Sequence, residues 1–131
     1  MSFDKHKLLS QTRMEHAREC LDAAKELYKC GNYKSAVNRA YYSIFHAMRA
    51  VLAFDEIDMK HHSGVIAEFR RLYIKTQKID KCVSEIISML FDIRTDSDYD
   101  DFFSIEREEA DAQIKNAELF FEQIDAFLQN R

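Results

Sequence analysis

The fold is decided by residues 36–52, AVNRAYYSIFHAMRAVL, in which apolar side chains return every three or four positions. That spacing places them on one face of an α-helix, because an α-helix turns once in 3.6 residues. Beside this apolar face the segment carries tyrosines, arginines and a histidine, which makes it a candidate site as well as a core helix. We therefore predict a long helix over about residues 33–54.

Working outward from this segment, the same periodicity predicts four further helices. One precedes it over about residues 5–29 and ends at Gly31, since glycine readily takes the left-handed conformation that ends helices. Three follow it, each opened by a side chain that can cap free N–H groups: a short one from Ser63, one from Asp80 to about Ser97, and one from Ser104. Brief connections between them predict an all-α fold, an up-and-down antiparallel helical bundle of four to five helices. We expect a single domain over residues 1–131.

The composition agrees with a helical, water-soluble protein. Proline is absent and glycine occurs twice, whereas β-rich folds need many turn residues. No stretch approaches the ~20 apolar residues of a membrane span, and no basic segment followed by an apolar run stands at the N-terminus. We therefore expect no membrane association and a cytoplasmic location.

The charge is divided unevenly along the chain. Residues 1–81 hold 15 Lys and Arg against 10 Asp and Glu, and residues 82–131 hold 4 against 13. Such a division predicts an interaction surface for a partner or for a second copy of the chain.

One candidate site lies on the helix over 33–54. Arg39 and His46 are seven residues apart, close to two helical turns, so they project from nearly the same side with Tyr42 beside them. This stripe either lines a groove, or it consists of core aromatics and a boundary histidine whose polar atoms are satisfied.

A second candidate is Arg94, which continues the buried stripe of the fourth helix. A desolvated guanidinium needs an acceptor, and Asp98 lies one turn further along. Arg94 is therefore either one half of an internal ion pair or the holder of a bound anion.

We expect no metal and no cofactor. The acidic residues from 96 to 101 resemble the start of a calcium-binding loop, but Asp101 stands at its glycine position and Arg107 at its bidentate glutamate position. His61 and His62 are adjacent, which is not zinc-ligand spacing, and they are interpreted as a polar loop.

The segments YYSIFHA, HSG and RTDSDYDD, in this order, are similar to those of HEPN domains (higher eukaryotes and prokaryotes nucleotide-binding), and in particular of a small stand-alone prokaryotic branch. The resemblance covers about residues 10–128. It implies a helical bundle that forms a homodimer and pairs with a small nucleotidyltransferase, antitoxin-like, in a toxin–antitoxin or stress module.

The resemblance also implies a site. Active HEPN toxins are metal-independent endoribonucleases whose motif is an arginine, four to six residues, then a histidine. Arg94 matches the arginine, but the position after four intervening residues is Tyr99. Because a tyrosine with an unperturbed pKa of about 10 is a poor base, we expect weak or no RNase activity.

Three functions follow as hypotheses. In the first, Arg94 holds the anion of a nucleotide, Asp98 orients Arg94, and Tyr99 and Tyr42 contact a base beside Arg39; Tyr99 is then also a possible acceptor of a nucleotidyl group. In the second, Arg94 and His46 are the catalytic residues of an RNase. In the third, the chain is a structural bundle that binds no ligand.

Overall fold

The structure is a computed structural model that describes residues 4–131, and this range contains five α-helices, one π-helical turn and no β-strand. The elements are α1 (Lys5–Lys29), α2 (Tyr33–Phe54), α3 (His62–Phe69), the π-helical turn η1 (Arg70–Ile74), α4 (Cys82–Tyr99) and α5 (Arg107–Gln129). The predicted all-α bundle is confirmed. None of the helices in residues 4–131 combines the length and the hydrophobicity needed to cross a membrane.

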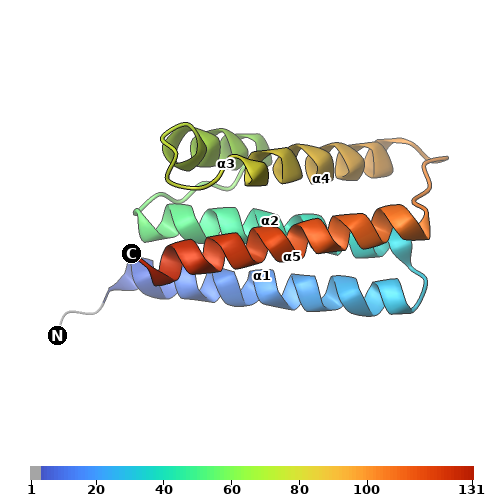
Figure 1. The fold of residues 1–131 in the computed structure, drawn as a ribbon, viewed down its shortest axis with the longest axis horizontal. Coiled ribbons are helices and arrows are strands. Elements are labelled where there is room, and N and C mark those ends of the chain that lie inside the picture. Colours follow the sequence, from blue (N-terminus) through green and yellow to red (C-terminus); the bar gives the residue numbers. More distant parts are fainter. Residues whose placement is uncertain (1–3) are drawn as a thin grey trace.

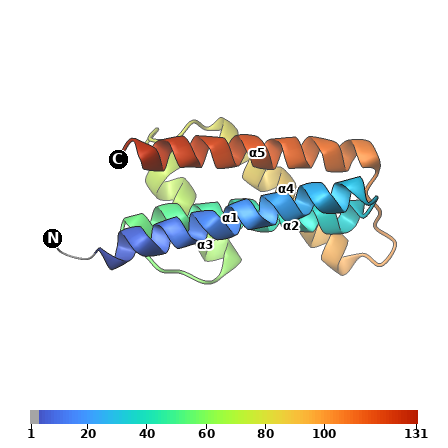
Figure 2. The ribbon, with the colours of Figure 1, turned by 90° about the horizontal axis from the view of Figure 1, so that it is seen from below.

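α2 is the central helix of the bundle. It runs antiparallel to α1, α5 lies along this pair, and α3 and α4 cover the opposite side of α2 (Figure 1; Figure 2 shows the same elements from below). α2 therefore packs against all four other helices, and its buried surface mixes large side chains with alanines that let neighbouring helices approach. This explains why the segment over residues 36–52 determines the fold.

The core takes large side chains from all five helices, among them Leu21, Tyr41, Phe69, Leu90 and Phe120, each under 3% exposed. Burial of one such side chain contributes about 1.5–3 kcal/mol. The packing holds the middle of α2 against the C-terminal half of α4, where the candidate residues lie.

Two predicted N-caps are wrong. α3 begins at His62 rather than after Ser63, and no side chain caps it. The His62 ring packs against a ring of α2, which draws this residue into the first turn. α5 begins at Arg107 with Glu106 at the cap position, so Ser104 lies outside the helix.

The other predicted helix boundaries agree closely with the structure. α1 and α2 begin and end where expected, and Gly31 has the left-handed φ of +80°. The Asp80 carboxylate accepts a hydrogen bond from the Cys82 N–H at 2.8 Å, although the formal cap position of α4 is Lys81.

The third helix departs from the regular period after Phe69. The π-helical turn η1 adds one residue to the turn, and Tyr73 is buried with its hydroxyl donating to Asp55, whereas Leu72 stays half-exposed.

Candidate functional site

Arg94 lies on α4 where that helix packs against α2. Its Nη2 donates a hydrogen bond to the Tyr42 hydroxyl at 3.1 Å. Its guanidinium carbon lies 5.3 Å from the centre of the Tyr41 ring and 5.6 Å from that of Tyr42, within cation–π range. The side chain is 23% exposed, so its charge is partly desolvated but still reachable from solvent.

Asp98 is the local partner of Arg94, as the spacing predicts. Its Oδ2 lies 3.1 Å from the Arg94 Nε, yet that buried Nε has no partner in hydrogen-bonding geometry. The contact is therefore a pairing of charges and not a directed bond, and the Asp98 carboxylate is 41% exposed. Asp98 therefore offsets part of the charge of Arg94 but does not form a bidentate ion pair with its guanidinium.

His62 is a site residue that the sequence interpretation missed, because a polar loop was expected there. Its Nδ1 lies 2.7 Å from the Tyr41 hydroxyl, and its ring stacks on Phe45 at 4.1 Å between centres. Burial, together with the positive charges of Arg94 and Arg49, lowers its pKa. Its presence in the HSG segment was the one sequence signal that pointed to it.

His46 lies on the same side of α2 as Tyr42 but not against Arg94. Its ring neighbours are His16, Tyr42 and Phe45, so His46 and Arg94 share Tyr42 as a neighbour. Burial and the positive charges of His16 and Arg49 lower the pKa of His46 to about 4. The buried Nδ1 of this histidine has no hydrogen-bond partner.

Arginines surround the aromatic rings on more than one side. Arg39 lies 5.1 Å from the centre of the Tyr42 ring, and Arg49 lies 5.9 Å from that of Phe45. Arg49 shares Oδ1 of Asp58 with Arg13, at 3.1 and 2.8 Å, so one carboxylate serves two cations. We call the set that joins α2, α3 and α4 the basic–aromatic cluster: Arg39, Tyr41, Tyr42, Phe45, His62 and Arg94.

Such a cluster can hold an anion and stack a planar group, since guanidinium and aromatic faces serve both purposes. The family model for the HEPN domain matches residues 10–126 of the chain. The chain belongs to the HEPN domain family. The resemblance noted on the sequence segments is thereby confirmed.

Relatives of this HEPN chain are similar over most of their length. A "UPF0332 protein" of Thermotoga maritima is 35% identical over 127 residues, which cover 97% of this chain and 96% of that protein. Two Methanocaldococcus jannaschii proteins, each named "Putative toxin", are 35% and 37% identical. They cover 88% and 87% of this chain and 78% and 84% of their own lengths.

Tyr99, at the position that the HEPN motif gives to histidine, is not part of the cluster. It is the last residue of α4 and is 86% exposed, and Phe102 in the following loop is 96% exposed. The structure thus brings Arg39, Tyr42 and Arg94 together, with Asp98 beside Arg94, and leaves Tyr99 projecting into solvent. Contact of Tyr99 with the same ligand stays a prediction.

The described residues of this HEPN protein contain no group of three or more His, Cys, Asp or Glu that could hold a metal ion. What the cluster offers instead is fixed positive charge, aromatic faces, and one histidine, His62, whose pKa is lowered by burial.

Proposed function

We propose that this protein is the toxin-like member of a two-protein module, and that its basic–aromatic cluster binds the phosphate and base of a nucleotide. One observation carries the proposal: Arg94 is held by a tyrosine hydroxyl and two aromatic rings, with its only ion-pair partner, among residues 4–131, poorly aligned and solvated. The two relatives named "Putative toxin" support the toxin-like part.

In this proposal each residue has a separate role. Arg94 binds the phosphate, because a charge-assisted hydrogen bond is about twice as strong as a neutral one. Tyr42 holds Arg94 through its hydroxyl and offers a ring to the base, and Arg39 lies 5.1 Å from the centre of that ring. Asp98 restricts the orientation of Arg94.

RNA cleavage by this chain alone is expected to be weak. Metal-free cleavage needs a group that titrates near pH 7 to move the proton of the 2′-hydroxyl. Tyr99 is a poor base, and burial lowers the pKa values of His62 in the cluster and of His46 beside it. In addition, residues 92–111 hold nine acids against Arg94 and Arg107, which opposes approach of a phosphate backbone.

The second candidate is an active metal-independent RNase. It is favoured by the position of His62, whose ring contacts the hydroxyl of Tyr41, the same side chain that lies in cation–π range of Arg94. Arg94 would stabilise the charged phosphorane, and His46 or His62 would move the proton. This candidate predicts growth arrest on expression, and loss of that arrest in Arg94→Ala.

An assay of RNA cleavage in EDTA distinguishes the two candidates. It compares the purified wild type with Arg94→Ala and with the control Arg71→Ala, an exposed arginine paired with Glu68. The proposed binding role predicts weak or no cleavage, equal in all three proteins. Cleavage by wild type and Arg71→Ala that disappears in Arg94→Ala would replace the proposal by the RNase.

The partner in this module is proposed to be a small nucleotidyltransferase that modifies Tyr99. The phenol oxygen of Tyr99 would attack the α-phosphate of ATP, forming a phosphodiester and releasing pyrophosphate, with the phenol proton passing to a base of the partner. Exposure of 86% at the end of α4 supports access by such an enzyme.

Mass spectrometry after incubation with ATP and a small nucleotidyltransferase from the same organism tests this step. The expected product carries one added adenylyl group on Tyr99, and Tyr99→Phe abolishes it. Wild-type protein that stays unmodified, or that is modified elsewhere, would overturn the step while leaving nucleotide binding at Arg94 open to its own test.

A further inference from the structure

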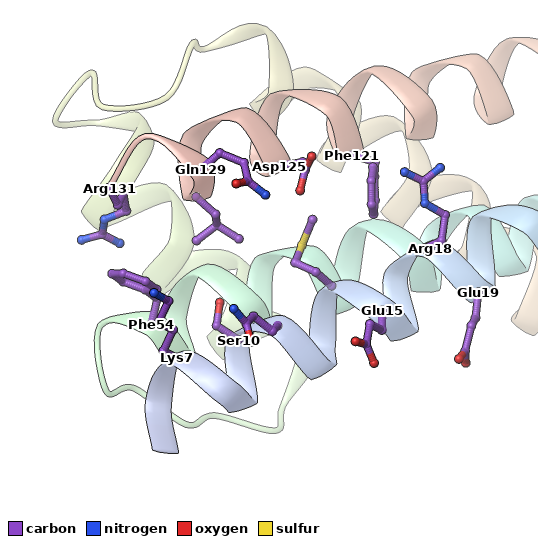
Figure 3. A pocket seen from close by; sticks show the side chains of 13 residues that line it. Lys7, Ser10, Glu15, Arg18, Glu19, Phe54, Phe121, Asp125, Gln129 and Arg131 are labelled. Carbon is purple, nitrogen blue, oxygen red and sulfur yellow. The ribbon is translucent and has the colours of Figure 1, made fainter. Parts of the chain in front are cut away.

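A large hollow lies away from the basic–aromatic cluster. It is a groove of about 700 Å³ between the N-terminal half of α1 and the C-terminal half of α5, closed at one end by Phe54 of α2 and by Arg131. Figure 3 shows the two helices as its walls, α5 above and α1 below. We call it the α1/α5 groove.

The floor of the groove is apolar. Met14 and Phe121 are its buried apolar residues, and the half-buried Leu128 and Phe54 continue the apolar lining toward the end closed by Arg131. The guanidinium of Arg18 lies 4.4 Å from the centre of the Phe121 ring and covers it at the other end (Figure 3). An elongated groove between two helical walls, with apolar side chains along its floor, has a shape that can receive a third helix.

The two edges of the groove are acidic. Glu15 and Glu19 follow each other by one turn on α1, and Asp125 lies on α5 (Figure 3). Glu122 lines the adjoining hollow, which shares Arg18, Phe121 and Asp125 with the groove. Within residues 4–131, no ion pair under 4 Å engages any of these four carboxylates.

The cations of the groove offset these acids only in part, because Lys7 and Arg18 stand against four carboxylates. Arg131 is bound to Asp55 through both terminal nitrogens, at 3.0 and 2.6 Å. Arg18 covers Phe121, and Lys7 lies near the N-terminal end of α1. An apolar floor between two unpaired acidic edges is complementary to a helix with one apolar stripe and Lys or Arg on both flanks of that stripe.

The length of the groove fits the same occupant. Its α1 wall extends from Lys7 to Glu19, which at 1.5 Å per residue is about 18 Å, or roughly three helical turns. We infer that the α1/α5 groove docks a basic amphipathic helix of about 12 residues from a partner protein. The inference does not depend on nucleotide binding at Arg94.

The test uses a synthetic helical peptide with a leucine stripe flanked by lysines, and a second peptide in which glutamates replace the lysines. Each is titrated into isotope-labelled full-length protein and followed by amide chemical shifts. The lysine peptide is expected to shift residues of the groove, the glutamate peptide is not, and raising the salt concentration is expected to weaken the binding. Equal binding of both peptides, or shifts confined to other surfaces, would overturn the inference.

Two variants locate the binding. Glu19→Lys reverses a charge at the groove edge and is expected to weaken the lysine peptide about fivefold, a change of roughly 1 kcal/mol. Asp101→Lys makes the same charge change in the loop after α4 and is expected to have no effect. Equal effects of the two variants would show general charge attraction and contradict a docking groove.

A third variant separates a partner helix from a second copy of the chain. Gln11 is exposed on the α1 wall, so Gln11→Trp fills the groove without disturbing the core. The variant is expected to lose peptide binding and to keep the sedimentation coefficient of the wild type. A change in oligomeric state would assign the groove to contact between copies and overturn the partner helix.

Discussion

Neighbouring side chains orient Arg94 without neutralising its charge. The Tyr42 hydroxyl accepts a hydrogen bond from one guanidinium nitrogen of Arg94, and the rings of Tyr41 and Tyr42 lie within cation–π range of the guanidinium. The arginine and its acid could be predicted from sequence because both lie on one helix, four residues apart. The role of Tyr42 could not be assigned, because it depends on how α4 packs against α2.

Removal of the Tyr42 hydroxyl tests how much this group contributes to positioning Arg94. Tyr42→Phe removes the hydrogen bond to Arg94 and leaves the ring in place, so we expect a loss of about 0.5–1.5 kcal/mol in nucleotide binding. Tyr33→Phe, at the start of α2 and outside the cluster, is the control. Isothermal titration with AMP is the measurement, and equal affinities of the two variants would show that the Tyr42 hydroxyl does not position Arg94.

His46 on α2 leads to a prediction about how the free energy of unfolding depends on pH. The pKa of His46 is about 4 in the folded protein and about 6.5 in an unfolded chain. Between these values the unfolded chain binds a proton that the folded protein does not, so the free energy of unfolding falls as the pH is lowered from 6.5 toward 4.

Urea unfolding at pH 7 and pH 5 checks this expectation. His46→Phe keeps an aromatic ring and is expected to lose less stability between the two pH values than the wild type does. His61→Asn, at an exposed histidine, is expected to behave as the wild type. Identical pH dependence in wild type and His46→Phe would mean that His46 is not buried as the structure has it.

At the scale of the element, α2 shows what sequence can predict about this protein and what it cannot. The ends of α1 and α2 follow from periodicity and from Gly31, which are local properties. The start of α3 at His62 follows from a contact between that ring and Phe45, seventeen positions earlier in the chain. Local cap preferences therefore assigned Ser63 the wrong role and placed His62 in a loop.

The turn between α1 and α2 was predicted from Gly31, one of the two glycines of the sequence. Gly31 has φ of +80°, where a side chain is strained, although a Cβ there would meet no atom within 4 Å. We expect Gly31→Ala to destabilise the protein by roughly 1 kcal/mol, measured by urea unfolding. The exposed Ser35→Ala, two residues into α2, is the control, and an unchanged midpoint for Gly31→Ala would contradict the left-handed turn.

The whole molecule combines a basic–aromatic cluster on α2, α3 and α4 with an acidic C-terminal segment. The 4 to 13 ratio of basic to acidic residues in residues 82–131 predicts attraction to a basic surface, and we propose that a second copy supplies it in a homodimer. Sedimentation velocity is expected to give a dimer at low salt that weakens as salt screens the charges. A monomer at all salt concentrations would contradict this arrangement.

The central claim, that Arg94 binds the phosphate of a nucleotide, is tested most directly by titrating AMP into wild type, Arg94→Ala and Arg71→Ala, with the stability of each measured in parallel. We expect wild type and Arg71→Ala to bind alike and Arg94→Ala to bind at least about tenfold more weakly, because a hydrogen bond to a charged group contributes roughly 1.5–3 kcal/mol. Absence of AMP binding in the wild type, combined with a loss of several kcal/mol of stability in Arg94→Ala, would contradict the claim. Arg94 would then be a structural ion pair of the bundle.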